Sequence, residues 1–423
     1  MIQVRIILIS VPVLILLWIG LSPKGNFPGI QYFSFFVIFF LAAMVPLLKP
    51  WRITITPFGV LFILVFLLWW TSLIASFVIN INDVRIGSFF EVGRPLLLAM
   101  LFLCGYLSFK ENGASNWEYW LISSSKFLLL IMLLVSVIQL LYPDFFSFIW
   151  SSEKTSGLGG IVRVTGTMYN PNSFAFFVSV LCLGVVAHTG IKRSWFWIMI
   201  ALVLVILASS RTMMLAFPVA LVMMYWLNAI SNGILTASFK MIAVFGIFMT
   251  VILVGVSLFS EYLPYASQIL TLLKSPEAIS EVSSFAARDE QWGQRLAYWI
   301  SKGTENILFG AGSTSELRVG DSDLLYVLFR LGLFGALMHL SLYFIFFYLA
   351  WNTRRHKVGI WFCGVMTLTV ISGITVDTLA GWQFSMYVFM IAGAAYAAYV
   401  QYAEPILIYK KQSGVHETTA FIK

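Results

Sequence analysis

Arginine side chains stand at the edges of long apolar runs in this sequence, where they could bind phosphate groups. A guanidinium is a planar fork that holds a phosphate through two parallel hydrogen bonds, whereas a lysine offers only a point charge. Each of these arginines could instead pair with a nearby acid such as Glu91 or Asp289, so both interpretations stay open. The candidate phosphate- and substrate-binding arginines are Arg85, Arg94, Arg163, Arg211, Arg288, Arg295, Arg318 and Arg330.

Two carboxylates, Asp321 and Asp323, lead into the apolar run 322–350. A carboxylate beside a sugar hydroxyl can orient it and take its proton. The alternative is simple capping, because acidic side chains are favoured at the amino-terminal end of a helix. The sequence therefore offers candidate phosphate ligands together with a candidate base.

Two short motifs place arginines beside expected helix starts. Asn170 and Pro171 are typical of the cap and the first residue of a helix, with Arg163 before them and Asn172 directly after. Arg211 lies in a tight connection between two apolar runs, beside the start of the second. Because helix amino termini attract anions, we expect these side chains to contribute to one anion-binding surface.

The composition is that of an integral membrane protein. Of the 423 residues, 60% are hydrophobic and 10% are charged, whereas soluble domains carry about 25% charged residues. The net charge of +8 is spread over short loops, which argues against a nucleic-acid-binding domain. The three cysteines fall inside apolar runs, where we expect them to be buried rather than to form a disulfide or a metal site.

The expected fold is an all-α polytopic membrane protein with about twelve transmembrane helices. Lys and Arg in the short loops predict that both termini are cytoplasmic, and that one large loop, 261–321, is periplasmic. This divides the chain into nine helices in 1–260, the loop, three helices in 322–402 and a cytoplasmic tail, 403–423. The predicted spans are about 4–21, 30–48, 57–79, 92–109, 122–142, 171–189, 194–209, 212–230, 239–260, 322–350, 359–378 and 382–402.

Within the large loop, residues 286–303 have the pattern of an amphipathic helix lying on the membrane surface, with Trp292, Leu296, Trp299 and Ile300 on one face.

The histidines fall on the cytoplasmic side under this topology. His188 and His339 each lie 17 residues into a helix that starts outside, roughly 25 Å down at 1.5 Å per residue. His356 is expected in a cytoplasmic loop and His416 in the tail. An active site on the outer side would therefore use a carboxylate as its base.

These motifs, in this order, resemble the O-antigen polymerase and ligase superfamily of membrane enzymes that transfer lipid-linked glycans. The resemblance covers about residues 163–335 and the overall hydropathy pattern. It rests on Arg163 with Gly166, Asn170-Pro171-Asn172, Ser210-Arg211-Thr212, Arg-x-x-x-Trp at Arg288 or Arg295, Leu308-Phe309-Gly310-Ala311-Gly312, and the helix entry that ends at Gly332.

The resemblance implies a membrane-embedded, GT-C-like glycosyltransferase of the bacterial inner membrane with a periplasmic active site. Its substrate would be an undecaprenyl-pyrophosphate-linked oligosaccharide within the membrane lipid, with no nucleotide sugar, cofactor, metal or nucleic acid; a chain-length regulator is an expected type of partner. Arg211, with Arg288 or Arg295, would bind the donor pyrophosphate. Asp321 or Asp323 would orient the acceptor hydroxyl.

Ligases of this family carry a histidine eleven residues before a glycine, and counting back from Gly332 gives Asp321 (332 − 11 = 321). This departure favours an O-antigen polymerase over the alternative, a ligase that transfers polymer to lipid A-core. A flippase or other transporter of lipid-linked oligosaccharides is a further alternative, and would place ionisable residues near the membrane midplane on broken helices. A noncatalytic scaffold would leave the arginines unexplained.

Overall fold

The computed structural model describes residues 2–22, 30–47, 54–83, 86–142, 163–168, 170–231, 283–312, 322–376 and 381–412, with a few single residues between these ranges. Every regular element in these ranges is a helix. The elements are α1 (Ile2–Leu21), α2 (Ile30–Leu47), α3 (Pro57–Ile79), η1 (Ile81–Asp83), α4 (Ile86–Leu141), α5 (Pro171–Thr189), α6 (Ile191–Leu207), α7 (Arg211–Ser231), α10 (Ser283–Ser301), α11 (Thr304–Phe309), α12 (Asp323–Asn352), α13 (Lys357–Gly373) and α14 (Trp382–Gln412).

Long apolar helices make this a helical, multi-pass membrane protein. Six described helices are long and apolar enough to cross a bilayer, and three shorter helices are also apolar. The predicted span 239–260 lies outside the described residues, so the total of about twelve stays a prediction. The six begin and end at Pro57–Ile79, Ser88–Leu141, Pro171–Thr189, Arg211–Ile230, Asp323–Asn352 and Phe384–Gln401.

Two helix starts follow directly from local sequence. Thr56 caps α3, accepting a hydrogen bond from the backbone N–H of Gly59 at 3.1 Å, and Pro57 is the first helical residue. Asn170 caps α5 in the same way through the N–H of Asn172 at 2.8 Å. A proline in this place loses no hydrogen bond, because the first N–H groups of a helix have no partner within it.

Two glycines with positive φ break helices that are otherwise continuous. Gly113 (φ 72°) divides α4, which therefore contains both predicted spans 92–109 and 122–142. Gly332 (φ 69°, ψ −171°) divides α12 into a half that begins at Asp323 and a half that ends at Asn352. A helical span is therefore present where 322–350 was predicted, but it is broken at Gly332 rather than straight.

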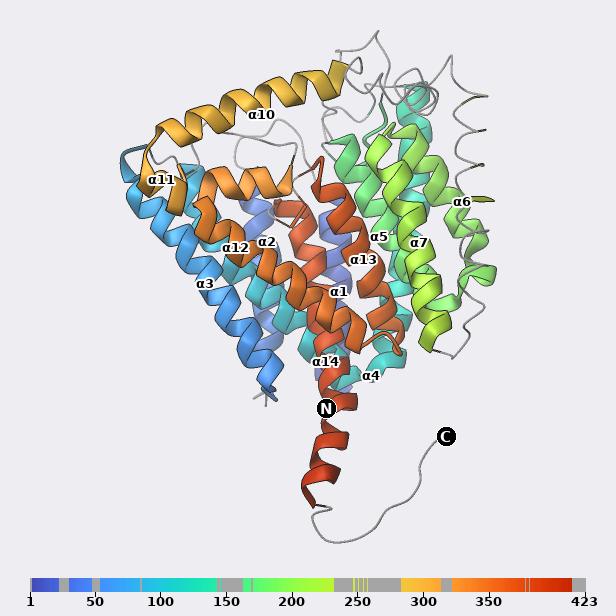
Figure 1. Ribbon diagram of the computed structural model, residues 1–423. Coiled ribbons are helices and arrows are strands. Elements are labelled where there is room, and N and C mark those ends of the chain that lie inside the picture. Colours follow the sequence, from blue (N-terminus) through green and yellow to red (C-terminus); the bar gives the residue numbers. More distant parts are fainter. Residues whose placement is uncertain are drawn as a thin grey trace.

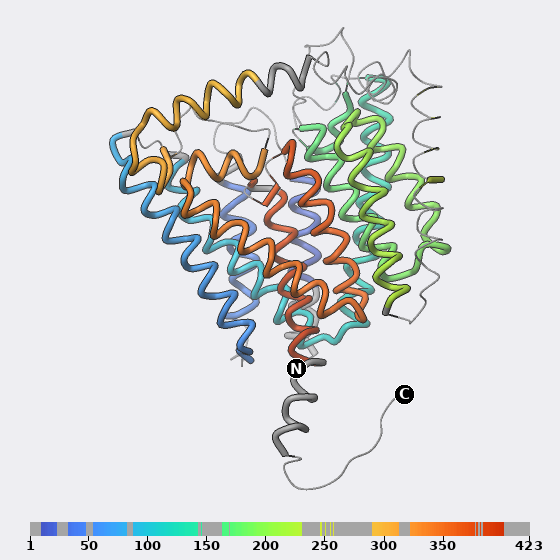
Figure 2. The backbone as a smooth tube through the Cα atoms, viewed as in Figure 1, coloured from blue at the N-terminus to red at the C-terminus, as the bar shows by residue number. Residues whose placement is uncertain are grey.

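The helices pack side by side, and α10 lies across one end of the bundle (Figure 1). The start of α1 and the end of α14 lie at the opposite end, as the tube in Figure 2 also shows. We call these two ends the α10 end and the terminal end. Helix α14 continues to Gln412, so part of the segment predicted as a tail is helical.

Helices α4 and α14 pack backbone against backbone in the core, and two glycines allow this close approach. A Cβ added to Gly105 would lie 2.0 Å from the backbone oxygen of Met390, and one added to Gly393 would lie 1.9 Å from that of Phe102. Small residues at such a crossing let two backbones approach within van der Waals contact.

We expect Gly105→Ala to destabilise the protein by about 1–3 kcal/mol, because the new methyl group meets backbone that cannot move aside cheaply. Thermal unfolding of the purified protein in detergent measures this. Gly93→Ala on the same helix is the control, since its Cβ would meet nothing within 4 Å. Equal melting temperatures for the two variants would contradict the close packing of α4 on α14.

Candidate functional site

Arg163 hydrogen-bonds the short segment 163–168 to the residues after α6 and to the start of α5. Its Nε donates to the carbonyl of Ala208 at 3.1 Å, and its Nη2 lies 3.3 Å from the carbonyl of Ser209 and 3.4 Å from the side-chain oxygen of Asn172. These carbonyls follow the carboxyl-terminal end of α6, where a cation is favoured by the helix dipole. Arg163 and Asn172, both predicted to bind substrate, thus shape the turn that leads to Arg211.

The same loop is held from the other side by Gln139, which is 5% exposed. Its side-chain amide donates to the carbonyl of Gly166 at 2.8 Å, and its oxygen accepts from the N–H groups of Gly166 at 2.9 Å and Thr165 at 3.3 Å. One buried side chain therefore satisfies three backbone groups of the loop.

We expect Gln139→Leu to cost about 1–3 kcal/mol of stability, because buried backbone groups lose their partners. Thermal unfolding in detergent is the measurement. Gln294→Leu serves as the control, because Gln294 is exposed and makes its 3.1 Å bond to Glu290 in solvent. If the two variants unfold at the same temperature, the loop does not depend on Gln139.

Arg211 is the first residue of α7 and is half-buried. A cation is disfavoured at a helix amino terminus, where the dipole is positive, so its presence there is not explained by helix stability. The next residue, Thr212, places its hydroxyl 2.6 Å from that of Thr375, directly after α13. The start of α7 therefore lies against the carboxyl-terminal end of α13.

Asp323 lies against the same end of α13. Its Oδ2 is 2.7 Å from Nε2 of His339 and accepts a hydrogen bond from the hydroxyl of Tyr343 at 2.8 Å. That hydroxyl is also 3.3 Å from the hydroxyl of Thr378. Gly373 sits beside this group, since an added Cβ would lie 3.4 Å from the Cβ of Asp323. We call Asp323, His339, Tyr343 and Thr378 the Asp323 cluster.

The position of His339 corrects the sequence-based exclusion of histidine from this end of the protein. A straight helix would place His339 roughly 24 Å from Asp323 at 1.5 Å per residue. The break at Gly332 instead folds the second half of α12 back, so the two side chains are hydrogen-bonded. A glycine within an apolar helical run was the one signal in the sequence for this break.

Asp323 is 2% exposed, and His339 is 1% exposed. The cap position of α12 belongs to Ser322, and no side-chain hydrogen bond caps this helix. Burial of an ionisable pair within a membrane helix is costly, which makes it a functional candidate. Simple capping therefore does not account for Asp323.

Arg94 and Arg330 share the carboxylate of Glu91, with nitrogen to oxygen distances of 3.4 Å each. Arg94 is buried and its guanidinium also lies over the ring of Trp69, at 5.8 Å from the centroid. The ring of Trp69 is in turn 6.1 Å from that of His339. These two arginines therefore pair with an acid, as the first of the two interpretations expected. Trp69 lies between Arg94 of this group and His339 of the Asp323 cluster.

Among the candidate phosphate-binding arginines with described side chains, Arg295 is the one that lies on α10, at the α10 end. Arg295 is half-buried on α10. Trp299 is buried with Phe329 of α12 and Ala311, and Trp292 packs beside them, whereas Leu296 and Ile300 are exposed. The predicted amphipathic helix is therefore present, with its two tryptophans facing the bundle. Arg85, Arg318, Asp321 and the side chain of Arg288 lie outside the described residues.

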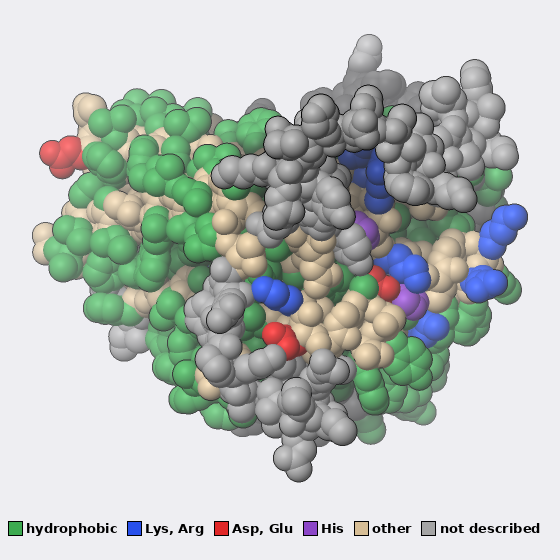
Figure 3. Space-filling model, turned by 90° about the horizontal axis from the view of Figure 1, so that it is seen from below, with side chains coloured by type: hydrophobic (Ala, Val, Ile, Leu, Met, Phe, Trp, Pro, Cys, Tyr) green, Lys and Arg blue, Asp and Glu red, His purple; other side chains and the backbone are tan. Residues whose placement is uncertain are grey.

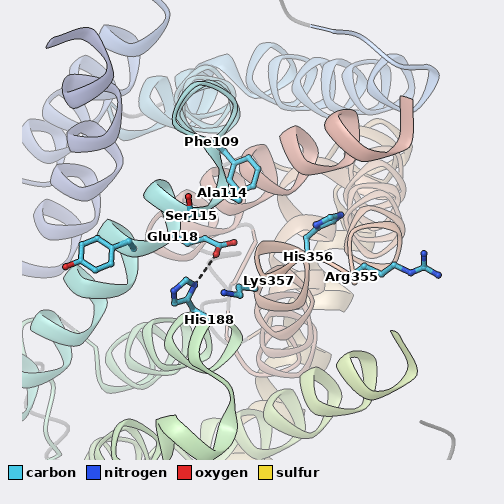
Figure 4. A pocket seen from close by; sticks show the side chains of 9 residues that line it. Phe109, Ala114, Ser115, Glu118, His188, Arg355, His356 and Lys357 are labelled. Carbon is cyan, nitrogen blue, oxygen red and sulfur yellow. Dashed lines mark hydrogen bonds and ion pairs between the residues drawn. The ribbon is translucent and has the colours of Figure 1, made fainter. Parts of the chain in front are cut away.

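A second charged region lies at the terminal end. A cavity of about 490 Å³ is lined by both halves of α4, the end of α5 and the turn before α13. Figure 4 shows Glu118 and His188 joined by a hydrogen bond, with Lys357 pointing toward them and Arg355 pointing away; the bond is 3.0 Å. Seen from this end, histidine side chains lie together with basic and acidic side chains away from the edge of the face, and further basic side chains stand at one edge (Figure 3).

His356 also lines this cavity, and burial together with the charge of Arg355 lowers its pKa. His188 lies in the last turn of α5 and His356 in the turn before α13, as the sequence predicted. His416 is outside the described residues. The pairing of Glu118 with His188 was missed, because the two are 70 residues apart. Within the described ranges, no group of three or more His, Cys, Asp or Glu side chains could hold a metal ion.

The α10 end therefore brings together Arg211, the Asp323 cluster and the Glu91 group with Arg94 and Arg330, around α12 and the end of α13. Arg163 and Asn172 support this arrangement through the turn before α7. No protein-family model and no curated protein matches the chain.

Proposed function

We propose that the protein is a polysaccharide polymerase that transfers a growing glycan from undecaprenyl pyrophosphate to a hydroxyl of a lipid-linked repeat unit. The observation that carries the proposal is that Arg211 and Asp323 both lie against the carboxyl-terminal end of α13. A cation for the leaving group and a carboxylate for the acceptor are the two groups that this reaction needs. In this proposal the α10 end faces the periplasm.

The reaction forms one bond and breaks one. The acceptor oxygen bonds to the anomeric carbon of the donor, and the bond from that carbon to the pyrophosphate oxygen breaks. The electron pair leaves with the pyrophosphate, whose charge Arg211 and the start of α7 balance, with Arg295 on α10 as the second cation. Asp323 takes the proton of the acceptor hydroxyl.

A ligase of the same chemistry is the second candidate, and His339 is the observation that favours it. The lack of a histidine at this end was one part of the sequence argument for a polymerase, and the hydrogen bond between His339 and Asp323 removes that part. The other part remains, since Asp321 stands where the ligases carry a histidine. The two functions differ in their acceptor, which is a lipid-linked repeat unit for the polymerase and lipid A-core for the ligase.

A transporter is the third candidate, because α12 is broken and buried ionisable side chains lie beside it. Detergent-solubilised protein separates transport from catalysis, since it has no two compartments. We expect the purified protein to convert undecaprenyl-pyrophosphate-linked repeat units into a ladder of longer products on a gel. A protein that leaves the units unchanged is not a polymerase.

The products in cells distinguish polymerase from ligase. Loss of a polymerase leaves lipid A-core capped with one repeat unit, and the gene restores long chains. Loss of a ligase leaves long chains attached to undecaprenyl pyrophosphate, and this result would replace our proposal with the second candidate.

A further inference from the structure

In the Asp323 cluster, the hydrogen bonds of His339 and Tyr343 both go to one oxygen of the Asp323 carboxylate. Two groups meet the same carboxylate oxygen, Nε2 of His339 at 2.7 Å and the hydroxyl of Tyr343 at 2.8 Å. An ionised carboxylate can only accept hydrogen bonds, so the imidazole must carry its hydrogen on Nε2 to bind it.

The other imidazole nitrogen decides where the ring carries its hydrogen. Nδ1 of His339 is buried and has no hydrogen-bond partner among the described residues. A hydrogen placed there would be an unsatisfied buried donor, which is costly. The geometry therefore places the hydrogen of His339 on Nε2, from which the ring donates to Asp323.

The surroundings fit a buried carboxylate held by its neighbours. Among the described residues, the charged or titratable groups near His339 are Asp323 and Tyr343 on α12 and, on the other side of Trp69 of α3, Arg94 of α4. From α13 the described neighbours of the cluster are uncharged: Gly373, and Thr369, whose carbonyl accepts from Thr378 at 3.0 Å.

We infer that His339 is a positioning residue for the proposed transfer, and that it acts by holding the carboxylate of Asp323 oriented toward the acceptor hydroxyl. This inference rests on the proposed function. Tyr343 has the same role through the second hydrogen bond. His339 itself takes no proton in the reaction; the acceptor proton goes to Asp323.

The test compares variants by the rate of polymerisation per folded protein, using the purified full-length protein in detergent and undecaprenyl-pyrophosphate-linked repeat units. Leucine at 339 donates no hydrogen bond, so His339→Leu should lower the rate by about 10-fold. Tyr343→Phe should lower it as well. Glutamine can donate from a nitrogen that replaces Nε2, so His339→Gln should restore the rate of the wild type.

The matched control is His188→Leu, which removes the same kind of hydrogen bond, to Glu118, at the terminal end. It should leave the rate unchanged. Wild-type rates in both His339→Leu and Tyr343→Phe overturn the inference. A folded His339→Gln protein as slow as His339→Leu overturns it as well, because a hydrogen-bond donor would then not be what His339 supplies. If His339→Leu does not fold, Tyr343→Phe and His339→Gln decide the result.

The proposed function and the inference fail in different ways. Wild-type protein that makes no polymer defeats the proposed function, and the inference with it. Wild-type protein that makes polymer, with His339→Leu and Tyr343→Phe variants that make it at the same rate, defeats the inference alone.

Discussion

Arg211→Ala is expected to leave cells with single repeat units instead of long chains. Polymerisation by the purified variant should fall by at least about 100-fold, the typical effect of removing a group that stabilises charge in a transition state. Arg211 is the first residue of α7, where the helix dipole adds to its attraction for an anion. Gel analysis of lipid-linked products measures the loss in cells and in vitro.

Two further variants show whether the guanidinium matters as a fork or as a charge. Arg211→Lys keeps the charge and loses the paired hydrogen bonds, so it should retain part of the activity. Arg193→Ala removes an exposed arginine at the start of α6 and should behave as wild type. Long-chain polymer made by a folded Arg211→Ala protein would remove Arg211 from the mechanism.

Gly332→Ala should prevent the protein from folding normally, at a cost of about 3 kcal/mol or more. The φ of 69° at Gly332 is one that alanine rarely adopts, and an added Cβ would lie 2.3 Å from the carbonyl oxygen of Leu308 and 2.5 Å from the nitrogen of Phe309. Both contacts are with backbone, so neither can relax by rotation of a side chain. The yield of monodisperse protein on gel filtration and its melting temperature measure the effect.

The same two segments also approach each other closely at Gly310, where an added Cβ would lie 2.1 Å from the carbonyl oxygen of Arg330. The control is Gly293→Ala on α10, which has no neighbour within 4 Å and should be neutral or slightly stabilising. A Gly332→Ala protein with the yield and melting temperature of the Gly293→Ala protein would show that the break in α12 is not required.

Local signals were sufficient to predict several helices from the sequence. The span predicted at 57–79 is α3 and the one at 171–189 is α5, because a capping side chain followed by proline fixes a helix start independently of the rest of the fold. The prediction that the three cysteines are buried is likewise confirmed.

The candidate site could be predicted only in part, because its contacts join residues far apart in sequence. Arg211 and Asp323 could be named from their positions beside apolar runs. Their common neighbour, the end of α13, could not, since nothing local in the sequence pairs Thr212 with Thr375, 163 residues away. His339 was excluded because depth was counted along a straight helix, and one residue with positive φ invalidates that count.

The arginines illustrate the same limit. Their positions were evident, but whether each pairs with an acid depends on tertiary packing. Arg94 and Arg330 share Glu91, whereas Arg163 donates to the backbone carbonyls of Ala208 and Ser209. A single sequence could not distinguish these outcomes.

The described residues form two hydrophobic clusters, and the two need not open together. Trp299, Ala311 and Phe329 form a small cluster that joins α10 to the first half of α12, whereas Val327 and Leu331 of the same half-helix lie in the large cluster of the bundle. Cooperative units of different stability open independently in native proteins. An opening confined to the small cluster would therefore release α10 and leave the half-helix that begins at Asp323 in place, so that movement of α10 need not cost the stability of the membrane-embedded part.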